Sequence, residues 1–257
     1  MTLVELLLAA SIMAMIAGVM GALASAVQTG SRYSQGHGLA AQHARVAFER
    51  ISRAVSEAHA TADYPGVVSA YETVGTWRFP DTLVVWHPVG APVNPTGPPL
   101  VKELIIYCPD PDRPNRLLEI TIPNDSRPAP LNEELNGTWR SQLQLLKRSP
   151  DAKRVVLTDL VRTALPDKGA ARRGAVRFER SLQPSASAWA AYRAGTTTWN
   201  NLAWPQGLYG ENVGTRQAWV RIELQLMPGA DAVAADSSGE QAIVFPGSAA
   251  LYTQLPR

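Results

Sequence analysis

Cysteine is nearly absent from this chain, with Cys108 the only one among 257 residues. No intramolecular disulfide can form, so the fold cannot depend on cross-links even if the protein works outside the cell. An excess of either charge sign is also absent, because 24 basic and 22 acidic residues leave a formal net charge of +2. This balance gives no reason to expect nucleic acid as an obligate partner.

Recognisable catalytic motifs are missing as well. The sequence has no Gly-x-Ser-x-Gly, no phosphate-binding glycine loop, no His-Glu-x-x-His and no pair of cysteines. We therefore expect no enzymatic activity, no catalytic residues and no cofactor. His37, His43 and His59 are separated by six and sixteen residues, which does not place them together on one helix face. We expect them at the solvated surface rather than around a metal ion.

Two further groups of polar residues have simpler explanations than ligand binding. Asp110, Asp112 and Asn115 share a turn, but their spacing lacks the glycine and the distal glutamate of a calcium loop. A cluster of arginines followed by tryptophans is a combination that DNA binding needs. We expect instead that the arginines form a solvated face and that the tryptophan rings are buried anchors. The residues of this second group are Arg172, Arg173, Arg177, Arg180, Trp189, Trp199 and Trp204.

Charge is absent from one long N-terminal segment. Between Leu6 and Ser31 there is no Asp, Glu, Lys, Arg or His, and only two serines interrupt the apolar run from Leu6 to Val27. As a helix this run would be roughly 33 Å long, enough to cross the hydrocarbon core of a bilayer. A secretory signal peptide is the alternative, but it needs a basic stretch before a shorter apolar core, and here an acid precedes the run.

The residues Met1 to Leu7 (MTLVELL) resemble the mature N-terminus of type IV pilins and type II secretion pseudopilins. The resemblance implies that a prepilin peptidase cuts a short leader before Met1 and methylates the new amine. It also implies that Glu5 is the family's conserved acid, which pairs with the N-terminal amine of a neighbouring subunit. Phenylalanine is the usual first residue in the family, so Met1 is a departure, and whether it follows a cleaved leader stays open.

Glu5 is an unusual residue to find just before a membrane-spanning run. A carboxylate in the buried part of a spanning helix costs roughly 2.5–3.5 kcal/mol, and such residues usually face a partner. Pairing with a neighbour's amine would neutralise both charges and set the axial register between subunits. The alternative is that Glu5 lies at the level of the lipid headgroups, solvated and without a function.

Small side chains recur every four residues along the apolar run, a pattern that lets helix backbones approach closely where lipid supplies no hydrophobic drive. Chance in an alanine-rich segment explains the spacing as well. These residues are Ala10, Ala14, Gly18, Ala22 and Ala26. Pilins often carry a proline at this chain's position 22, and Ala22 leaves Gly18 and Gly21 as the weak points of the helix.

The helix is expected to continue beyond the apolar run as an amphipathic segment that lies on a domain core. The glycines at positions 30, 36 and 38 mark its likeliest bend, between residues 30 and 38. Its apolar face comprises Ala44, Ala47, Phe48, Ile51, Val55 and Ala58. We thus divide the chain into an apolar helix at 1–30, an amphipathic half-helix at 31–60 and a β-rich globular head at 61–257.

Strand patterns follow, so the predicted fold class is α+β: a type IV pilin-like long N-terminal helix packed on an antiparallel sheet. Two of the strands should form a hairpin around the proline-rich turn at 108–115, while 88–99 and 181–217 are expected to be long loops. The predicted strands are 82–86, 103–108, 116–122, 175–180 and 218–227. This layout is similar to J-type minor pseudopilins, whose late strand follows a loop like Trp199 to Pro205.

Taken together, these features predict a structural subunit that polymerises through its N-terminal helix into a type IV pilus-like filament. Its partners would be other copies or other pilins, the prepilin peptidase, and the inner membrane before assembly. It would then lie in a periplasmic or extracellular filament. Two alternatives stay open: a minor pseudopilin that initiates or caps a type II secretion pseudopilus, and a monomeric membrane-anchored binding or enzymatic domain.

Overall fold

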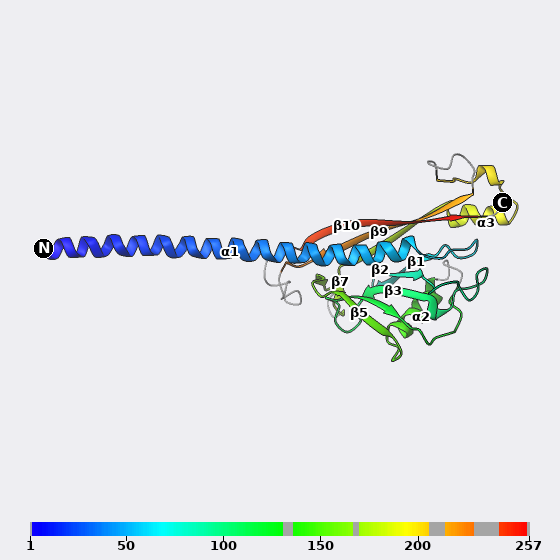
Figure 1. Ribbon diagram of the computed structural model, residues 1–257, viewed down its shortest axis with the longest axis horizontal. Helices are drawn as coiled ribbons and strands as arrows, with labels where there is room; N and C mark the ends of the chain where they lie inside the picture. The colour runs from blue at the N-terminus through cyan, green and yellow to red at the C-terminus, as the bar shows by residue number, and fades with distance from the viewer. Residues whose placement is uncertain (1, 131–135, 167–169, 206–213, 229–241, 256–257) are drawn as a thin grey trace.

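A computed structural model describes residues 2–130, 136–166, 170–205, 214–228 and 242–255. It shows one long helix, α1, that projects far beyond a head built on its C-terminal part (Figure 1). We use "head" for the three described β-sheets, the two shorter α-helices and the part of α1 that packs on them. The predicted α+β architecture, a long N-terminal helix with antiparallel sheets, is confirmed.

Helix α1 extends from Leu3 to Ser56 as 54 continuous helical residues, about 80 Å in length. Every described residue from Thr2 through Gln35 is exposed, and Ala40 is the first buried one. The predicted apolar face of the amphipathic half is confirmed: four of its residues are buried in the head core, and Phe48 and Ala58 are partly buried against it. Those four residues are Ala44, Ala47, Ile51 and Val55.

The expected bend between residues 30 and 38 is wrong, because helical structure passes through this stretch without a break and Figure 1 shows it straight. Gly36 has a different role. The backbone carbonyl oxygen of Pro228 lies so close that a Cβ atom at position 36 would be 2.0 Å from it. Because Gly36 has no side chain, the backbone at Pro228 can pass directly against α1. A Cβ atom at Gly30 or Gly38 would have no neighbour within 4 Å.

We expect Gly36→Ala to lower the free energy of unfolding of the head by about 1–3 kcal/mol, the usual cost of inserting a group into a filled space. Gly38→Ala is the matched control. It lies on the same helix with open space around it, so it should be neutral or stabilising by up to about 1 kcal/mol through helix propensity. Thermal unfolding followed by tryptophan fluorescence measures both. Equal effects of the two substitutions would contradict the close contact at Gly36.

A five-stranded antiparallel sheet forms the first layer of the head, in the order β1-β2-β3-β4-β5. One face contributes to the core around α1, and the opposite face is covered by α2 (Asn136–Lys147), whose Trp139, Leu143 and Leu146 are buried there. The predicted hairpin is confirmed as the β3–β4 pair. The strands are β1 (Val67–Val74), β2 (Trp77–Trp86), β3 (Leu104–Pro109), β4 (Leu117–Thr121) and β5 (Lys153–Thr158).

A second antiparallel sheet lies on the other side of α1, in the order β10-β9-β8 (Figure 1). Its strands are β8 (Val176–Gln183), β9 (Thr215–Leu226) and β10 (Ile243–Gln254). The predicted alternation in β9 is confirmed, with Val220, Ile222 and Leu224 buried in the same core as α1. The closest strand to α1 is β10, where Gly247 leaves room for the ring of Phe48. A short ribbon, β6 (Thr163–Ala164) with β7 (Arg173–Gly174), joins the two sheets in sequence.

The loop predictions are half right. Residues 88–99 contain no helix or strand. They are held by Glu103, the last residue of η1 (Val101–Glu103), whose buried carboxylate accepts a hydrogen bond from the amide of Val93 at 2.7 Å. The interval 181–217 is not one long loop. It contains α3 (Ala186–Arg193) and η2 (Trp199–Asn201), because aromatic side chains there build a small core of their own.

Candidate functional site

The N-terminal turn of α1 holds the acid that the sequence singled out. Thr2 is the N-cap residue, and its backbone amide donates to Oε2 of Glu5 at 2.9 Å. In return, the amide of Glu5 donates to Oγ1 of Thr2 at 3.4 Å. This is a reciprocal capping box, in which two of the free N–H groups at the helix start are satisfied. Met1 lies outside the described residues, so the predicted contact between Glu5 and an N-terminal amine stays a prediction.

The capping role of Thr2 was not among the sequence predictions, although the sequence carries its signal. Thr-x-x-Glu directly before an apolar run is the sequence pattern of a capping box. The helix start also carries partial positive charge, which favours a carboxylate at this end. The Glu5 carboxylate therefore has favourable interactions within its own chain.

The first half of α1 is an exposed apolar surface. Its large side chains lie open on all sides, for example Leu3 at 79% and Met13 at 72% exposure. Among the described residues, α1 is the one helix long and apolar enough to cross a membrane, and a signal sequence would pass the same test. The apolar half continues as regular helix into the buried half, so both belong to a single structural element.

The small residues of α1 form a ridge on this exposed surface. Ala10, Ala14, Gly18, Ala22 and Ala26 are all exposed, and a Cβ atom at Gly18 would have no neighbour within 4 Å. Steps of four residues advance by about 40° more than a full turn, so the ridge runs obliquely around the helix. Ridges of this i, i+4 type favour crossing angles of about −40° to −50° between packed helices.

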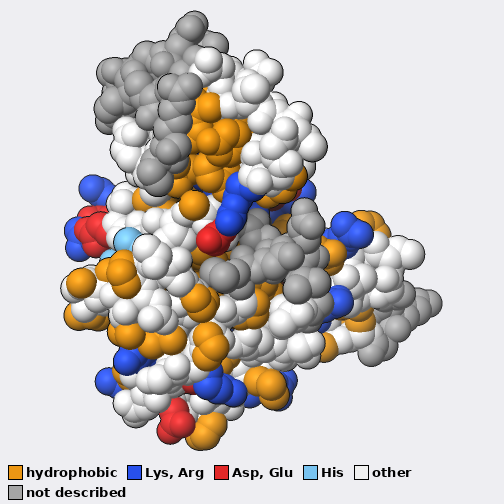
Figure 2. Space-filling model, turned by 90° about the vertical axis from the view of Figure 1, so that its right-hand side faces the viewer, with side chains coloured by type: hydrophobic (Ala, Val, Ile, Leu, Met, Phe, Trp, Pro, Cys, Tyr) orange, Lys and Arg blue, Asp and Glu red, His pale blue; other side chains and the backbone are white. Residues whose placement is uncertain are grey.

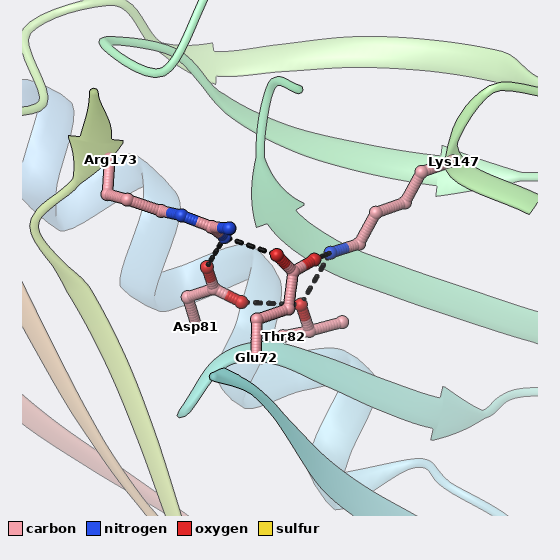
Figure 3. Close-up of polar contacts among 5 residues, drawn as sticks. All are labelled: Glu72, Asp81, Thr82, Lys147 and Arg173. Atoms are coloured by element: carbon pink, nitrogen blue, oxygen red, sulfur yellow. Dashed lines mark hydrogen bonds and ion pairs between the residues drawn. The ribbon is translucent and has the colours of Figure 1, made fainter. Parts of the chain in front are cut away.

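A cluster of charged side chains lies in the head, at a cavity of about 490 Å³ between β1, β2, α2 and β7 (Figure 3). Glu72 contacts both Arg173 and Lys147, the latter at 3.5 Å. Lys147 donates to Oγ1 of Thr82 at 2.8 Å, and Thr82 in turn donates to Oδ1 of Asp81 at 2.8 Å. Arg173 also faces Asp81, with 3.6 Å between the charged atoms.

The charges of this cluster balance, because two acidic and two basic side chains contact one another. Burial raises the pKa of Glu72, but Lys147 and Arg173 lower it by more, so the net pKa is below its ordinary value. Burial raises the pKa of Asp81, and the nearby charge of Glu72 adds to the rise. Two carboxylates are thus held by two cations from α2 and β7. The cluster ties α2 and β7 to the β1–β2 hairpin, and Thr82 within it is buried.

The remaining polar candidates have structural roles. Asp110 accepts hydrogen bonds from the amide of Asp112 at 2.9 Å and from that of Arg113 at 3.3 Å, as expected for a turn. Asn115 donates to the carbonyl oxygen of Asp159 at 3.0 Å. Burial raises the pKa of the Cys108 thiol to about 12, so this cysteine is unreactive at neutral pH.

The histidines are not simply solvated, which corrects the sequence prediction. His43 is partly buried, with Nδ1 at 3.1 Å from Oγ1 of Thr158 in β5. The ring of His59 packs edge-on against Trp86, with 4.5 Å between centroids. Both rings lie in the head, because His43 is in the part of α1 that packs there and His59 follows the C-terminal end of α1. Within the described part of the chain, no group of three or more histidine, cysteine or acidic side chains could hold a metal ion.

The arginines of the predicted basic cluster lie just before β7, in β7 and in β8, and each makes a polar contact within the chain. Arg172 contacts Thr163, and Arg173 contacts Glu72. Arg177 contacts Glu179, and Arg180 donates to the backbone carbonyl of Val67. The tryptophans are buried as predicted, in a small core at the end of the head opposite the N-terminus. Figure 2 views this end and shows hydrophobic side chains gathered in its upper part.

No protein-family model, curated protein or solved structure matches this chain. Its function is therefore inferred from its own residues and geometry.

Proposed function

We propose that this chain is a non-enzymatic subunit of a type IV pilus-like filament and that it polymerises through α1. The observation that carries this proposal is the exposed, uncharged run of α1 from Leu6 to Ser31, which continues as unbroken helix into the core of the head. Burying each Leu, Met, Ile or Val side chain is worth about 1.5–3 kcal/mol. Lipid covers this surface before assembly, and neighbouring copies of α1 cover it in the filament.

The geometry supports a simple order of events. The chain waits in the inner membrane after processing by a prepilin peptidase, with the Glu5 carboxylate held by the capping box at the helix start. During assembly the amine of Met1 on an adjacent subunit takes part in neutralising Glu5. The oblique ridge of small residues lets the helices approach closely. Because α1 is unbroken, the head follows the helix and lies on the outside of a periplasmic or extracellular filament.

A minor pseudopilin that initiates or caps a type II secretion pseudopilus is the second candidate. The observation that favours it is the segment from Trp199 to Pro205, which is packed into the small aromatic core of the head and lies ahead of β9 in the chain. This order is similar to the layout of J-type pseudopilins. Such a subunit would use the same α1 surface but would be present in few copies. A monomeric, membrane-anchored domain is the third candidate and differs in needing no contact between helices.

Site-specific photocrosslinking in the producing cells tests the proposal. With a photoreactive benzoylphenylalanine in place of Ile16, which is 58% exposed on α1, we expect a ladder of covalent multimers in the sheared, detergent-free filament fraction. The matched control carries the same group in place of Val89, a fully exposed loop residue of the head, and should give few adducts. A monomeric anchor would instead give adducts to lipid only, and a minor subunit would crosslink to other pilins without forming a ladder.

A further inference from the structure

The outer face of the β8–β9–β10 sheet carries two exposed aromatic rings on neighbouring strands. Trp219 of β9 is 39% exposed and Tyr252 of β10 is 56% exposed. The alternate residues of β9 are buried against α1, so Trp219 points to the opposite, solvent side. The register pairs Trp219 with Ala250 and Tyr252 with Gln217, which makes the two rings diagonal neighbours, with Cα atoms about 7–8 Å apart.

These two residues, here called the aromatic platform, lie on an uncrowded part of the sheet. The strand neighbours of Trp219 are Ser181 on one side and Ala250 on the other, and both are small. The Tyr252 hydroxyl accepts a hydrogen bond from Nε2 of Gln217 at 2.9 Å, which holds the phenol in place. A flat ligand can therefore lie across both rings without meeting a bulky neighbour from the adjacent strands.

A row of alternating charges borders the platform on the same face. Arg221 lies 3.9 Å from Glu179 and 4.0 Å from Glu223, and Arg177 contacts Glu179. All four side chains are between 23% and 55% exposed. The row has a net charge of zero and offers hydrogen-bond donors and acceptors side by side.

A groove continues the platform past the edge of β8. It has a volume of about 580 Å³ and is lined by Trp219 from one sheet and by Tyr71 from β1 of the other. The guanidinium group of Arg78 is stacked 4.9 Å from the centre of the Tyr71 ring. Ser69 and Ser181 add hydroxyl groups to the lining. Aromatic faces and small polar groups thus extend along one continuous surface.

We propose that this surface binds a polysaccharide chain, with pyranose rings lying on Trp219 and in the groove beside Tyr71. The apolar C–H face of a pyranose matches an exposed aromatic ring, and its hydroxyl groups both donate and accept hydrogen bonds. The neutral row of arginine and glutamate side chains complements such a ligand. The groove lining itself is net basic, because Arg78 and Arg180 join Arg177 and Glu179 there, but Glu179 and Glu223 stand among these arginines and would repel the phosphates of a nucleic acid. The proposal does not depend on filament assembly, because the surface lies on the head.

The test is retention of the full-length chain, in a detergent without a sugar headgroup, on insoluble cellulose, on chitin and on calcium-crosslinked alginate beads. Cellulose and chitin represent neutral polymers, and alginate represents a carboxylated one, so the three arms distinguish the two sources of pyranose rings. We expect retention on at least one polymer, at least tenfold weaker binding for Trp219→Ala, and a smaller loss for Tyr252→Ala. Trp77→Ala is the matched control, because Trp77 is 60% exposed but does not line the groove, and its binding should be unchanged.

Circular dichroism and thermal unfolding establish that each variant is folded before binding is compared. Absence of retention on all three polymers would overturn the proposal. So would equal binding by wild type and a folded Trp219→Ala variant. Binding of a single-stranded oligonucleotide that is lost with Trp219→Ala, without any glycan binding, would assign the surface to nucleic acid instead.

Discussion

Glu5→Gln is expected to reduce filament yield at least a hundredfold while the head remains folded. Glutamine at this position can still complete the capping box with Thr2, so the substitution removes the negative charge and little else. In the assembled core the amine of a neighbouring Met1 would then be buried without a counter-charge. Breaking a buried ion pair in this way costs about 3–5 kcal/mol, and each tenfold loss of affinity corresponds to about 1.4 kcal/mol. Every incoming subunit would incur this loss.

Thr2→Ala separates the two roles of the N-terminal turn. It removes the hydroxyl that caps α1 but keeps the Glu5 carboxylate, and losing a cap costs about 1 kcal/mol. We expect its filament yield to fall far less than that of Glu5→Gln. The measurement is the amount of subunit in sheared filaments relative to total cellular subunit, with head folding followed by tryptophan fluorescence. Normal yield from Glu5→Gln would show that Glu5 acts only at the headgroup level.

Lys147→Met is expected to lower the free energy of unfolding of the head by about 3–5 kcal/mol. The Lys147 side chain is only 7% exposed and contacts both Thr82 and Glu72, so methionine keeps its apolar stem but removes its charge. Glu72 and Asp81 would then share Arg173 as their remaining cation within the cluster (Figure 3). Leaving a buried charge without its partner carries this cost. For a domain stable by 5–15 kcal/mol, the loss is a large fraction.

The control for this prediction is the next residue in the chain. Arg148→Met removes a charge that is 67% exposed and lies 3.8 Å from Asp112, a surface pair worth at most about 1 kcal/mol. Chemical denaturation at pH 7 measures both variants. Burial holds the pKa of Asp81 above its ordinary value. Ionisation of Asp81 therefore lowers the stability of the head as the pH rises, and protonation at low pH removes this loss. The Lys147→Met defect should therefore shrink as the pH falls toward 4, and a pH-independent defect would contradict this account.

Local sequence patterns predicted those elements whose residues carry their own signal. The uncharged run and the 3.6-residue periodicity identified α1, and the strict alternation at 220–226 identified β9. β10 was missed, because Pro246 and Gly247 interrupt its pattern. An edge strand tolerates a proline, and Gly247 serves a tertiary contact with Phe48. Neither reason can be read from β10 alone.

The candidate sites divide in the same way. The motif around Glu5 and the ridge of small residues lie within one helix, whose geometry follows from residue spacing, so the sequence by itself determined them. Tertiary structure decided the rest. Glu72, Lys147 and Arg173 are separated by tens of residues, and they meet because α2 and β7 pack beside the β1–β2 hairpin. Trp219 and Tyr252 are neighbours because of the β9–β10 register, and Gly36 contacts Pro228 instead of bending α1. Contacts between distant segments depend on how whole elements pack, and local periodicity carries no information about that packing.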